Sequence, residues 1–394
     1  MVRSTGATLL PSACPPTPHE MDNGGAQATS VDLVAALPPL EYTSPPPGDT
    51  AACNLARFST PRRDDVVASP LFQGLDGAGV RVAVLDTGID ATHPALVHRI
   101  DVAASKNFTS DDPEDIADQG GHGTHCAGII AAEDRGAIMS GIAPAATLIV
   151  CKVLGDSGRG SWPWVAAGIR HAVAQGADVI SMSMGDGSDH TCGEVFTDGT
   201  CDLYKALQKA LAAGVVVVVA AGNAGGRSAK NEINPPGSFG GVITVASHND
   251  AGGRSTFSSM GGELDVMAPG ETFSTYARGK PYQIGFRAYR PGRDYEQLRG
   301  TSMACPLVAG LAALLVQAGR RPTAAGLSDE LRDRIDRSHF RARTTYEVRE
   351  MLRYFSDRPH EHRREDGYGG LSRVYSFVKS SVGDRQLTAK AAAV

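Results

Sequence analysis

The chain has 394 residues, of which 42% are hydrophobic and 21% charged, so it can form a sizeable buried core. Its net charge of −5, from 38 basic and 43 acidic residues, lacks the strongly basic balance typical of nucleic-acid-binding proteins. We expect no nucleic-acid partner. We also expect no membrane span, because no apolar run reaches the roughly 18 to 20 residues that a bilayer requires.

Residues 1–60 differ from the rest of the chain in composition. They are rich in Pro, Gly, Ser and Thr and show almost no hydrophobic periodicity, and the stretch "TSPPPGDT" favours extended, solvated backbone. We expect a disordered extension here. The alternative is a short pro-sequence that covers the active site until it is removed. No secretory h-region precedes the first prolines, so we expect a cytoplasmic protein, with secretion as the alternative.

Five continuous apolar runs rich in Val and Ile follow, as is typical of strands covered on both faces of a parallel sheet. They span residues 80–86, 147–153, 178–184, 215–221 and 242–247. Helical patterns lie between them, and those at 164–176 and 203–214 each end in Gly, a common helix C-cap. This alternation predicts an α/β fold with a doubly wound, mostly parallel sheet and helices on both faces.

We expect one catalytic domain at residues 61–383, followed by a flexible tail at 384–394. The part from about 320 to 374 is rich in both Arg and acidic residues and predicts exposed, salt-bridged helices. A basic face for a partner is the alternative there, and the interleaved acidic residues argue against it.

Three polar residues stand where chemistry is expected in such a fold, at the carboxyl edge of the sheet. Asp86 closes the first strand, His122 lies in the glycine-rich "GGHGTHCAG", and Ser302 begins an apolar helix in "GTSMACP". Each residue also has a purely structural interpretation. Asp86 could cap a turn, His122 could be a hydrogen-bonded histidine of the core, and Ser302 could cap a helix. Together they supply a nucleophile, its base and a carboxylate that orients the base. The order Asp, His, Ser differs from that of α/β-hydrolases.

Asn223 follows the apolar run 215–221 and is a candidate oxyanion-hole donor, together with the backbone N–H of Ser302. An ordinary Asn turn is the alternative. We predict no metal site: His125 could share a helix face with His122, but no third ligand has metal-binding spacing. The seven cysteines include Cys192 and Cys201, which flank a turn and could form a disulfide in an oxidising compartment.

The segments "VAVLDTGID", "GGHGTHCAGIIAAE", "AAGNAG" and "GTSMACP" resemble the subtilisin family of serine proteases, peptidase family S8. The resemblance runs from about residue 57 to 318 and, weakly, to "DGYGG". It implies a serine endopeptidase that hydrolyses peptide bonds in peptide or protein substrates through an acyl-enzyme. The alternatives are a catalytically silent peptide-binding or regulatory module on the same fold, and an esterase or acyl-transfer enzyme using the same site.

The resemblance also implies that an extended peptide substrate binds as an added strand between two backbone segments, with side-chain pockets beside it. The matching positions are Gly158, Arg159, Gly160, Trp162, Ser183, Met184, Gly185, Ala221 and Gly222. Trp162 would line the pocket for the residue four places before the cleaved bond. Ala221 and Gly222 would form a wall of the pocket for the residue just before that bond.

The sequence departs from the family pattern in two places, and each departure leads to a prediction. A carboxylate ligand of the family's tight calcium site falls at Ala95, and Arg135 occupies another ligand position, so we expect that site to bind no calcium. We predict no cofactor, with a weaker structural calcium elsewhere left open. Insertions around Cys192 and within 271–299 flank the site and predict a restricted substrate range.

Overall fold

The computed structural model describes most of the catalytic region and little of the N-terminal extension. The described residues are 30–32, 72, 74–110, 112–133, 139–185, 201–225, 233–249, 253–278, 294–320 and 344–355.

A seven-stranded sheet forms the centre of the molecule, and every neighbouring pair of strands in it is parallel. Across the sheet the strands are β3 (Lys106–Asn107), β4 (Thr147–Lys152), β2 (Arg81–Asp86), β6 (Val179–Met182), β7 (Val216–Ala220), β8 (Ile243–His248) and β9 (Val266–Pro269). Four of the five predicted apolar runs contain one of these strands, and the fifth, 242–247, covers all of β8 except His248. The predicted α/β fold is confirmed.

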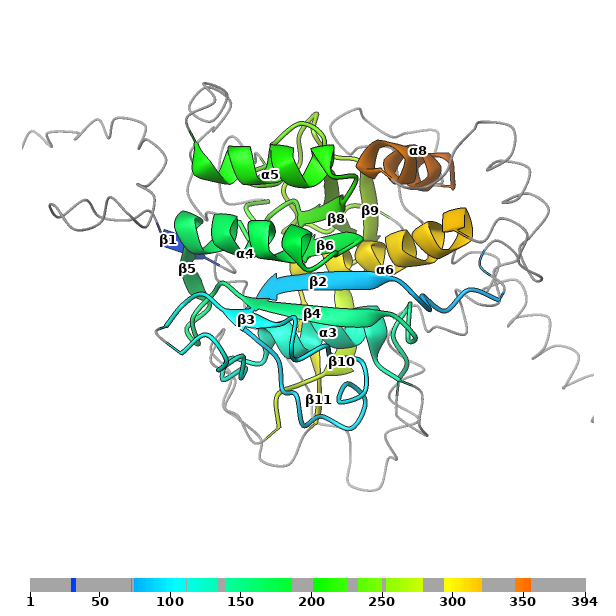
Figure 1. Ribbon diagram of the computed structural model, residues 1–394. Helices are drawn as coiled ribbons and strands as arrows, with labels where there is room; N and C mark the ends of the chain where they lie inside the picture. The colour runs from blue at the N-terminus through cyan, green and yellow to red at the C-terminus, as the bar shows by residue number, and fades with distance from the viewer. Residues whose placement is uncertain are drawn as a thin grey trace, which may run out of the picture.

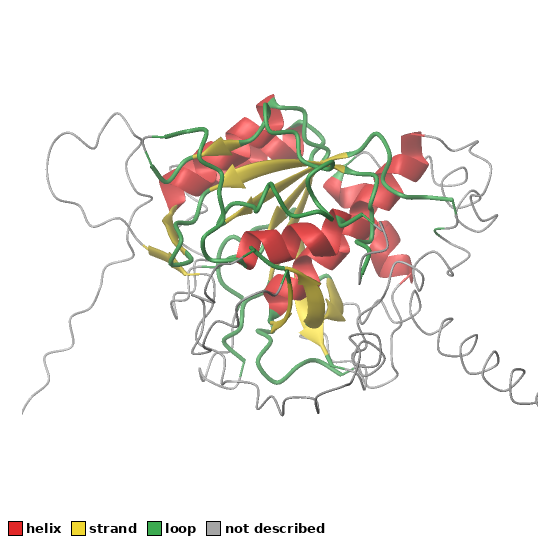
Figure 2. Ribbon diagram, turned by 90° about the horizontal axis from the view of Figure 1, so that it is seen from below, coloured by secondary structure: helices red, strands yellow, loops and turns green. Residues whose placement is uncertain are grey.

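Helices cover both faces of this sheet (Figures 1 and 2). On one face lie α4 (Trp162–Ala174) and α5 (Asp202–Ala212), and on the other lie α3 (His122–Ala131) and α6 (Thr301–Arg320). Alternate residues of β2 show the two layers directly. Val82 and Val84 belong to the core beneath α3 and α6, whereas Ala83 and Leu85 belong to the core beneath α4 and α5.

The order in which successive strands join the sheet reverses at β2, although the strands themselves stay parallel. After β2 the chain passes through α3 to β4, on one side of β2, and then through α4 to β6, on the other side. Such a switch point opens a crevice at the carboxyl ends of the strands, where α/β proteins place their ligands. Asp86, the last residue of β2, lies at this point.

Two antiparallel pairs lie outside the central sheet. β10 (Glu271–Thr275) and β11 (Tyr295–Arg299) form a hairpin beside α3 that leads directly into α6. β1 (Ser30–Asp32) pairs with β5 (Arg159–Ser161), so part of the N-terminal extension lies against a segment implied in substrate binding.

One C-terminal helix corrects the expectation of exposed helices after residue 320. Helix α8 (Thr345–Phe355) buries Val348, Met351 and Leu352 in the same core as α3 and α6. The hydroxyl of Thr345 donates to the carbonyl of Val215 at 2.8 Å. This helix is therefore amphipathic, and its apolar face is part of the domain.

Helix α6 contradicts the expectation that no apolar run is long enough to cross a bilayer. Among the described residues it is the one helix long and apolar enough to cross a membrane, with a mean hydropathy of 1.7. The whole of that apolar window is buried within the molecule. Because it packs against the sheet along its length, α6 is the core helix that carries Ser302.

Candidate active site

Asp86 and His122 form a buried pair at the carboxyl end of β2. Oδ1 of Asp86 lies 2.8 Å from Nδ1 of His122, and the two side chains are 1% and 4% exposed. The backbone N–H of Thr87 also donates to Oδ1 of Asp86, at 2.7 Å, which fixes the carboxylate. Because Nδ1 donates to Asp86, Nε2 carries the lone pair of the neutral ring. Within the described residues Nε2 has no hydrogen-bond partner, so it is free to accept a proton.

The electrostatic surroundings of His122 favour its charged form. Burial alone lowers its pKa, but the charge of Asp86, the hydrogen bond to Asp86 and the charge of Asp118 outweigh burial and raise it above its ordinary value of 6.5. His125, one helical turn away, behaves in the opposite way. Burial and the neighbouring His122 lower the pKa of His125 to about 3, so its ring is neutral.

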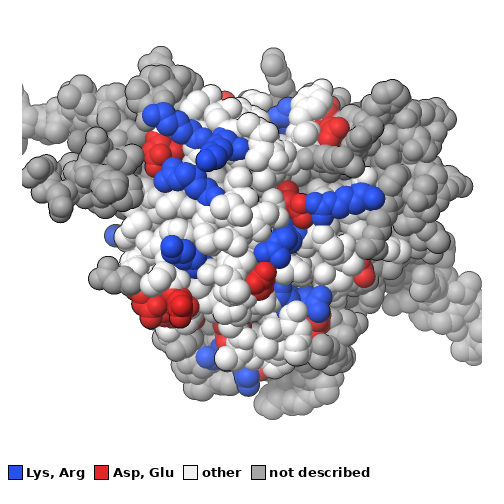
Figure 3. Space-filling view, in the orientation of Figure 1, with Lys and Arg blue, Asp and Glu red and all other residues white. Residues whose placement is uncertain are grey.

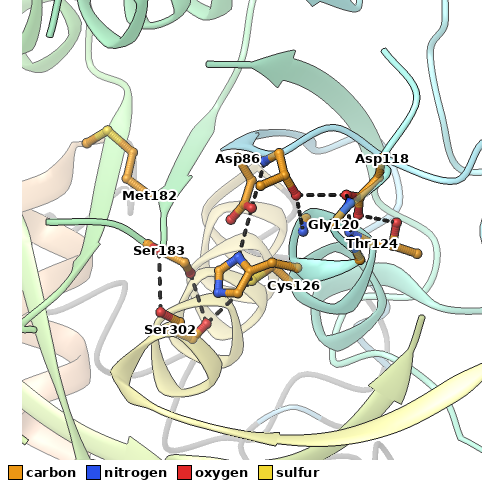
Figure 4. Close-up of polar contacts among 12 residues, drawn as sticks. Asp86, Asp118, Gly120, Thr124, Cys126, Met182, Ser183 and Ser302 are labelled. Atoms are coloured by element: carbon orange, nitrogen blue, oxygen red, sulfur yellow. Dashed lines mark hydrogen bonds and ion pairs between the residues drawn. The ribbon is translucent and has the colours of Figure 1, made fainter. Parts of the chain in front are cut away.

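Asp118 is a structural contributor that the sequence did not reveal. It is buried, and one of its oxygens accepts hydrogen bonds from the hydroxyl of Thr87 and the N–H groups of Gly120 and Gly121, at 2.7–3.0 Å. Its other oxygen accepts from the N–H and hydroxyl of Thr124, at 2.9 and 2.6 Å. Asp118 thus joins the end of β2, next to Asp86, to the first turn of α3 that carries His122 (Figure 4).

Tyr276, the residue that follows β10, contacts the same turn. Its hydroxyl donates to the carbonyl of Gly120 at 2.9 Å. Its ring lies so close to Gly121 that a Cβ there would be 2.2 Å from Cζ of Tyr276, and Gly121 has a φ of +83°. Only glycine fits both the contact and the backbone angle. The glycines before His122 therefore allow an aromatic ring to pack against the loop, beyond leaving the imidazole uncrowded.

Ser302 is the second residue of α6 and lies beside this pair, with an exposure of 2%. Its hydroxyl donates to the backbone carbonyl of Ser183 at 3.4 Å and makes no hydrogen bond to His122 in this arrangement. In Figure 4, Asp86, Cys126, Ser183 and Ser302 lie close together. The three predicted catalytic residues are therefore brought to one site. The structure forms the Asp86–His122 contact and leaves the Ser302–His122 contact open.

Asn223 lies at the same edge, three residues after β7, and is held by α6. Its Oδ1 accepts from the N–H and the hydroxyl of Thr301, at 3.0 and 3.2 Å, which turns Nδ2 the other way. A Cβ built on Gly300 would lie 3.5 Å from Nδ2 of Asn223 and 3.6 Å from the backbone N of Ser302. Both predicted oxyanion donors therefore lie close to Gly300, whose φ of +152° favours glycine at this position.

The comparisons with known proteins agree with this geometry. The family model described as the subtilase family matches residues 77–369. An intracellular serine protease of Paenibacillus polymyxa is 39% identical over 262 residues, which cover 65% of this chain and 73% of that protein. The major intracellular serine protease of Bacillus subtilis strain 168 is 41% identical over 248 residues, or 62% and 70% of the two chains. Subtilisin DY of Bacillus licheniformis is 40% identical over 245 residues, or 62% and 79%.

The chain belongs to the subtilase family. It is a serine-type endopeptidase that acts on peptide or protein substrates, as the sequence predicted.

The expected substrate-binding residues of this subtilase lie on or next to β5, β6, β7 and the start of α4. Arg159 and Gly160 belong to β5, with Gly158 just before them, and Ser183, Met184 and Gly185 follow β6. Trp162 is the first residue of α4 and is 2% exposed, so its ring is covered in this structure. Ala221 and Gly222 follow β7, and the N–H of Gly222 donates to the hydroxyl of Thr301 at 3.2 Å.

Cys126 places a thiol against His122, the predicted catalytic base. Its sulfur lies 3.8 Å from Nδ1 of His122. Asp86, His122 and Cys126 are the one group of three in the described part of the chain whose ligand atoms lie close enough together, within 4.8 Å, to hold a metal ion. Because Nδ1 of His122 is already bonded to Asp86, this group is explained by the Asp86–His122 hydrogen bond and provides no separate argument for a metal.

The predicted disulfide between Cys192 and Cys201 is tested only in part, because the structure describes only one of the two residues. Cys201 forms a disulfide and begins α5 as its N-cap residue. The predicted partner, Cys192, lies outside the described residues, as does Arg135 of the predicted calcium loop.

Proposed function

We propose that Ser302 is the nucleophile of this endopeptidase, His122 its general base and Asp86 the carboxylate that orients the imidazole. The buried 2.8 Å contact between Asp86 and His122 carries this proposal, because it fixes the tautomer whose Nε2 can accept a proton. Rotation about the Cα–Cβ bond of Ser302 moves its hydroxyl from the carbonyl of Ser183 toward Nε2.

In the proposed reaction the hydroxyl oxygen of Ser302 attacks the carbonyl carbon of the substrate while its proton passes to Nε2 of His122. The tetrahedral intermediate collapses, the C–N bond breaks, and His122 gives that proton to the leaving amine. Water then attacks the acyl-enzyme with His122 as base, which releases the carboxylic acid and restores Ser302. Asp86 stabilises the imidazolium in both halves and keeps its own charge.

The oxyanion of each tetrahedral intermediate is proposed to bind between Nδ2 of Asn223 and the N–H of Ser302. The support is their common position around Gly300 and the hydrogen bonds that hold Oδ1 of Asn223 on Thr301. The N–H of Ser302 also belongs to the first turn of α6, where backbone donors have no helical partner.

Substrate is proposed to bind as an extended strand between residues 158–160 and 183–185, with Trp162, Ala221 and Gly222 lining side-chain pockets. The antiparallel pairing of Ser30–Asp32 with β5 supports this, since it shows a peptide strand on that edge. We expect kcat/KM to rise by about 10-fold or more when a peptide substrate is lengthened from two to four residues before the cleaved bond, because remote contacts contribute to transition-state binding. No length dependence would contradict the proposed groove.

The N-terminal extension is proposed to act as a pro-sequence that covers the crevice until it is cleaved. Its support is the same β1–β5 pairing, which lies where a substrate strand would lie. A chain that begins at residue 61 should be more active than the full chain, and a synthetic peptide of residues 20–45 should inhibit it competitively. Equal activity of both chains, with no inhibition by the peptide, would refute this regulation.

The substrate range is proposed to be narrow, because the sequence carries insertions at both sides of the crevice. Most of these insertions lie outside the described residues. Digestion of casein and of unfolded proteins, followed by sequencing of the fragments, tests the proposal. A few cleavage sites with a common sequence would support it, and equal cleavage at many unrelated sites would refute it.

Neither a cofactor nor a nucleic-acid partner is proposed. On the described surface in Figure 3, Lys and Arg side chains lie among Asp and Glu side chains, which fits a net charge of −5. At the position of the family's tight calcium site, Ala95 offers no carboxylate, and the neighbouring Glu133 already pairs with Arg99 at 2.7 Å.

A cytoplasmic location is proposed from the similarity to two proteases named as intracellular. The disulfide of Cys201 is the observation that opposes it, since disulfides are rare in the cytosol. Cell fractionation decides between the compartments: recovery with cytoplasmic markers supports the proposal, and recovery from the medium refutes it.

A further inference from the structure

Helix α6 contains a proline, Pro306, one turn after the nucleophile. Proline has no backbone N–H, so it cannot donate to the carbonyl of Ser302, which is its usual partner four residues earlier in an α-helix. Ser302 is buried, and buried backbone carbonyls are almost always hydrogen-bonded. The carbonyl of the nucleophile therefore needs a donor from elsewhere in the molecule.

Two side chains from other elements supply that donor. The hydroxyl of Ser183, just after β6, donates to the carbonyl of Ser302 at 2.9 Å. The thiol of Cys126, in α3, donates to the same carbonyl at 3.5 Å. Both side chains belong to residues that are 1% exposed, so water does not replace them easily.

The protonation of Cys126 suits a donor. Burial, together with the charge of Asp86, raises the pKa of this thiol well above its usual value of 9.0, so it keeps its proton at working pH. Ser183 forms a second hydrogen bond with Ser302: its backbone carbonyl accepts from the hydroxyl of Ser302 at 3.4 Å (Figure 4).

We propose, resting on the role proposed above for Ser302 as nucleophile, that Ser183 and Cys126 are positioning residues that hold Ser302 through the carbonyl that Pro306 leaves free. We call this set, formed by Ser183, Cys126, Pro306 and the carbonyl of Ser302, the carbonyl clamp. It joins the helix of Ser302 to the helix of His122, through Cys126, and to a substrate-binding segment, through Ser183. Its consequence is a fixed distance between nucleophile, base and substrate.

If the clamp positions the nucleophile, its loss should lower kcat with little change in KM, an effect that a purely structural role would not produce. Removing the hydroxyl in Ser183→Ala leaves the backbone that would bind substrate unchanged. We expect kcat, and the rate at which a fluorophosphonate labels Ser302, to fall by about 10- to 100-fold, since small misplacements of a reacting group cost this much. KM should change less than about 2-fold, because substrate binding is retained. Ser183→Thr, which keeps the hydroxyl, should recover most of the rate.

The decisive measurement repeats the substitution in a Pro306→Ala background. The alanine of that background has an N–H that can donate to the carbonyl of Ser302 in the ordinary helical way, so the loss of the Ser183 hydroxyl should then cost only about 3-fold or less. Ser181→Ala is the matched control: Ser181 is also buried, lies on β6 and contacts α6 through Cys305 at 3.8 Å, but it does not reach the clamp. It should keep kcat within about 2-fold in both backgrounds.

An equal penalty for Ser183→Ala with and without Pro306 would overturn the proposal, as would a change confined to Tm or KM. If Ser183→Ala does not fold, the weaker donor provides the same test. Cys126→Ala should slow labelling of Ser302 more than Cys126→Ser does, and the difference should disappear in the Pro306→Ala background. Persistence of that difference would overturn the proposal.

Discussion

Oδ1 of Asn223 accepts a hydrogen bond of 3.0 Å from the N–H of Thr301, 78 positions later in the chain. This contact decides which end of the amide faces the crevice. Since Oδ1 is held by α6, the donor Nδ2 is the end left for an oxyanion.

Replacing Asn223 by Ala should therefore lower kcat by about 10²- to 10³-fold, the range known for the corresponding loss in subtilisin. KM should hardly change, because the interaction forms in the transition state. Asn223→Asp keeps the shape and removes the donor, so it should lose a similar factor. Steady-state kinetics of either variant within about 3-fold of the parent would show that Asn223 does not hold the oxyanion.

The pH dependence of the enzyme should follow His122. The base must be neutral to accept a proton, and its pKa is raised above 6.5 by Asp86 and Asp118 despite burial. As pH falls through that raised pKa, His122 becomes protonated and kcat/KM must fall. The other histidine of the helix, His125, has a pKa of about 3 and stays neutral over this range. Full activity at pH 5.5 would contradict this assignment.

Asp118 should act on catalysis through the turn that carries His122. Asp118→Asn replaces an acceptor by a donor that faces backbone N–H groups and removes a negative charge near the imidazole. We expect kcat/KM to fall by about 10-fold or more, and its acidic limb to move to lower pH, because a charge that raises the pKa of His122 is lost.

Asp156 provides the matched control for the Asp118 variant. It lies near the same turn, since a Cβ on Gly120 would be 2.9 Å from its carbonyl oxygen, but its side chain is 48% exposed and pairs with Lys152. Asp156→Asn should leave the pH profile in place. An equal shift in both variants would mean that general surface charge, and not the buried carboxylate, sets the profile.

Calcium removal should leave the stability of the protein unchanged. A structural calcium present at 100 times its Kd contributes about 2.7 kcal/mol, which amounts to several degrees in Tm for a chain of this size. Thermal unfolding with EDTA and with added calcium should therefore give Tm values within about 1 °C of each other. A fall of several degrees on chelation would reveal a calcium site that Ala95 and the Arg99–Glu133 pair do not predict.

The fold and the predicted catalytic residues could be anticipated because their signals are local. Asp86 ends a Val-rich strand. His122 lies between two glycines at the start of a helix, and Ser302, also at a helix start, follows Gly300 by two residues. These positions are fixed by the strand and helix boundaries alone, which the structure places within a few residues of the predicted ones.

Asp118 and the buried face of α8 could not be recognised in the same way. Asp118 lies in an acidic loop, and its role depends on Thr87, 31 positions earlier in the chain and brought close only by the fold. In α8 the apolar residues are few and lie among charged ones, so the segment was interpreted as exposed. Val348, Met351 and Leu352 nevertheless follow helical spacing. That spacing was the available signal for burial.

The side chains of Asp86, His122 and Ser302 are proposed to act as one nucleophilic unit. The most direct test is labelling of the intact protein with a fluorophosphonate, followed by identification of the modified residue and by peptide hydrolysis assays on Ser302→Ala. We predict a single label on Ser302, dependent on His122, and loss of both labelling and peptide hydrolysis in a Ser302→Ala protein of unchanged Tm. Peptide hydrolysis that persists in that folded variant, or a label on another residue, would contradict the claim.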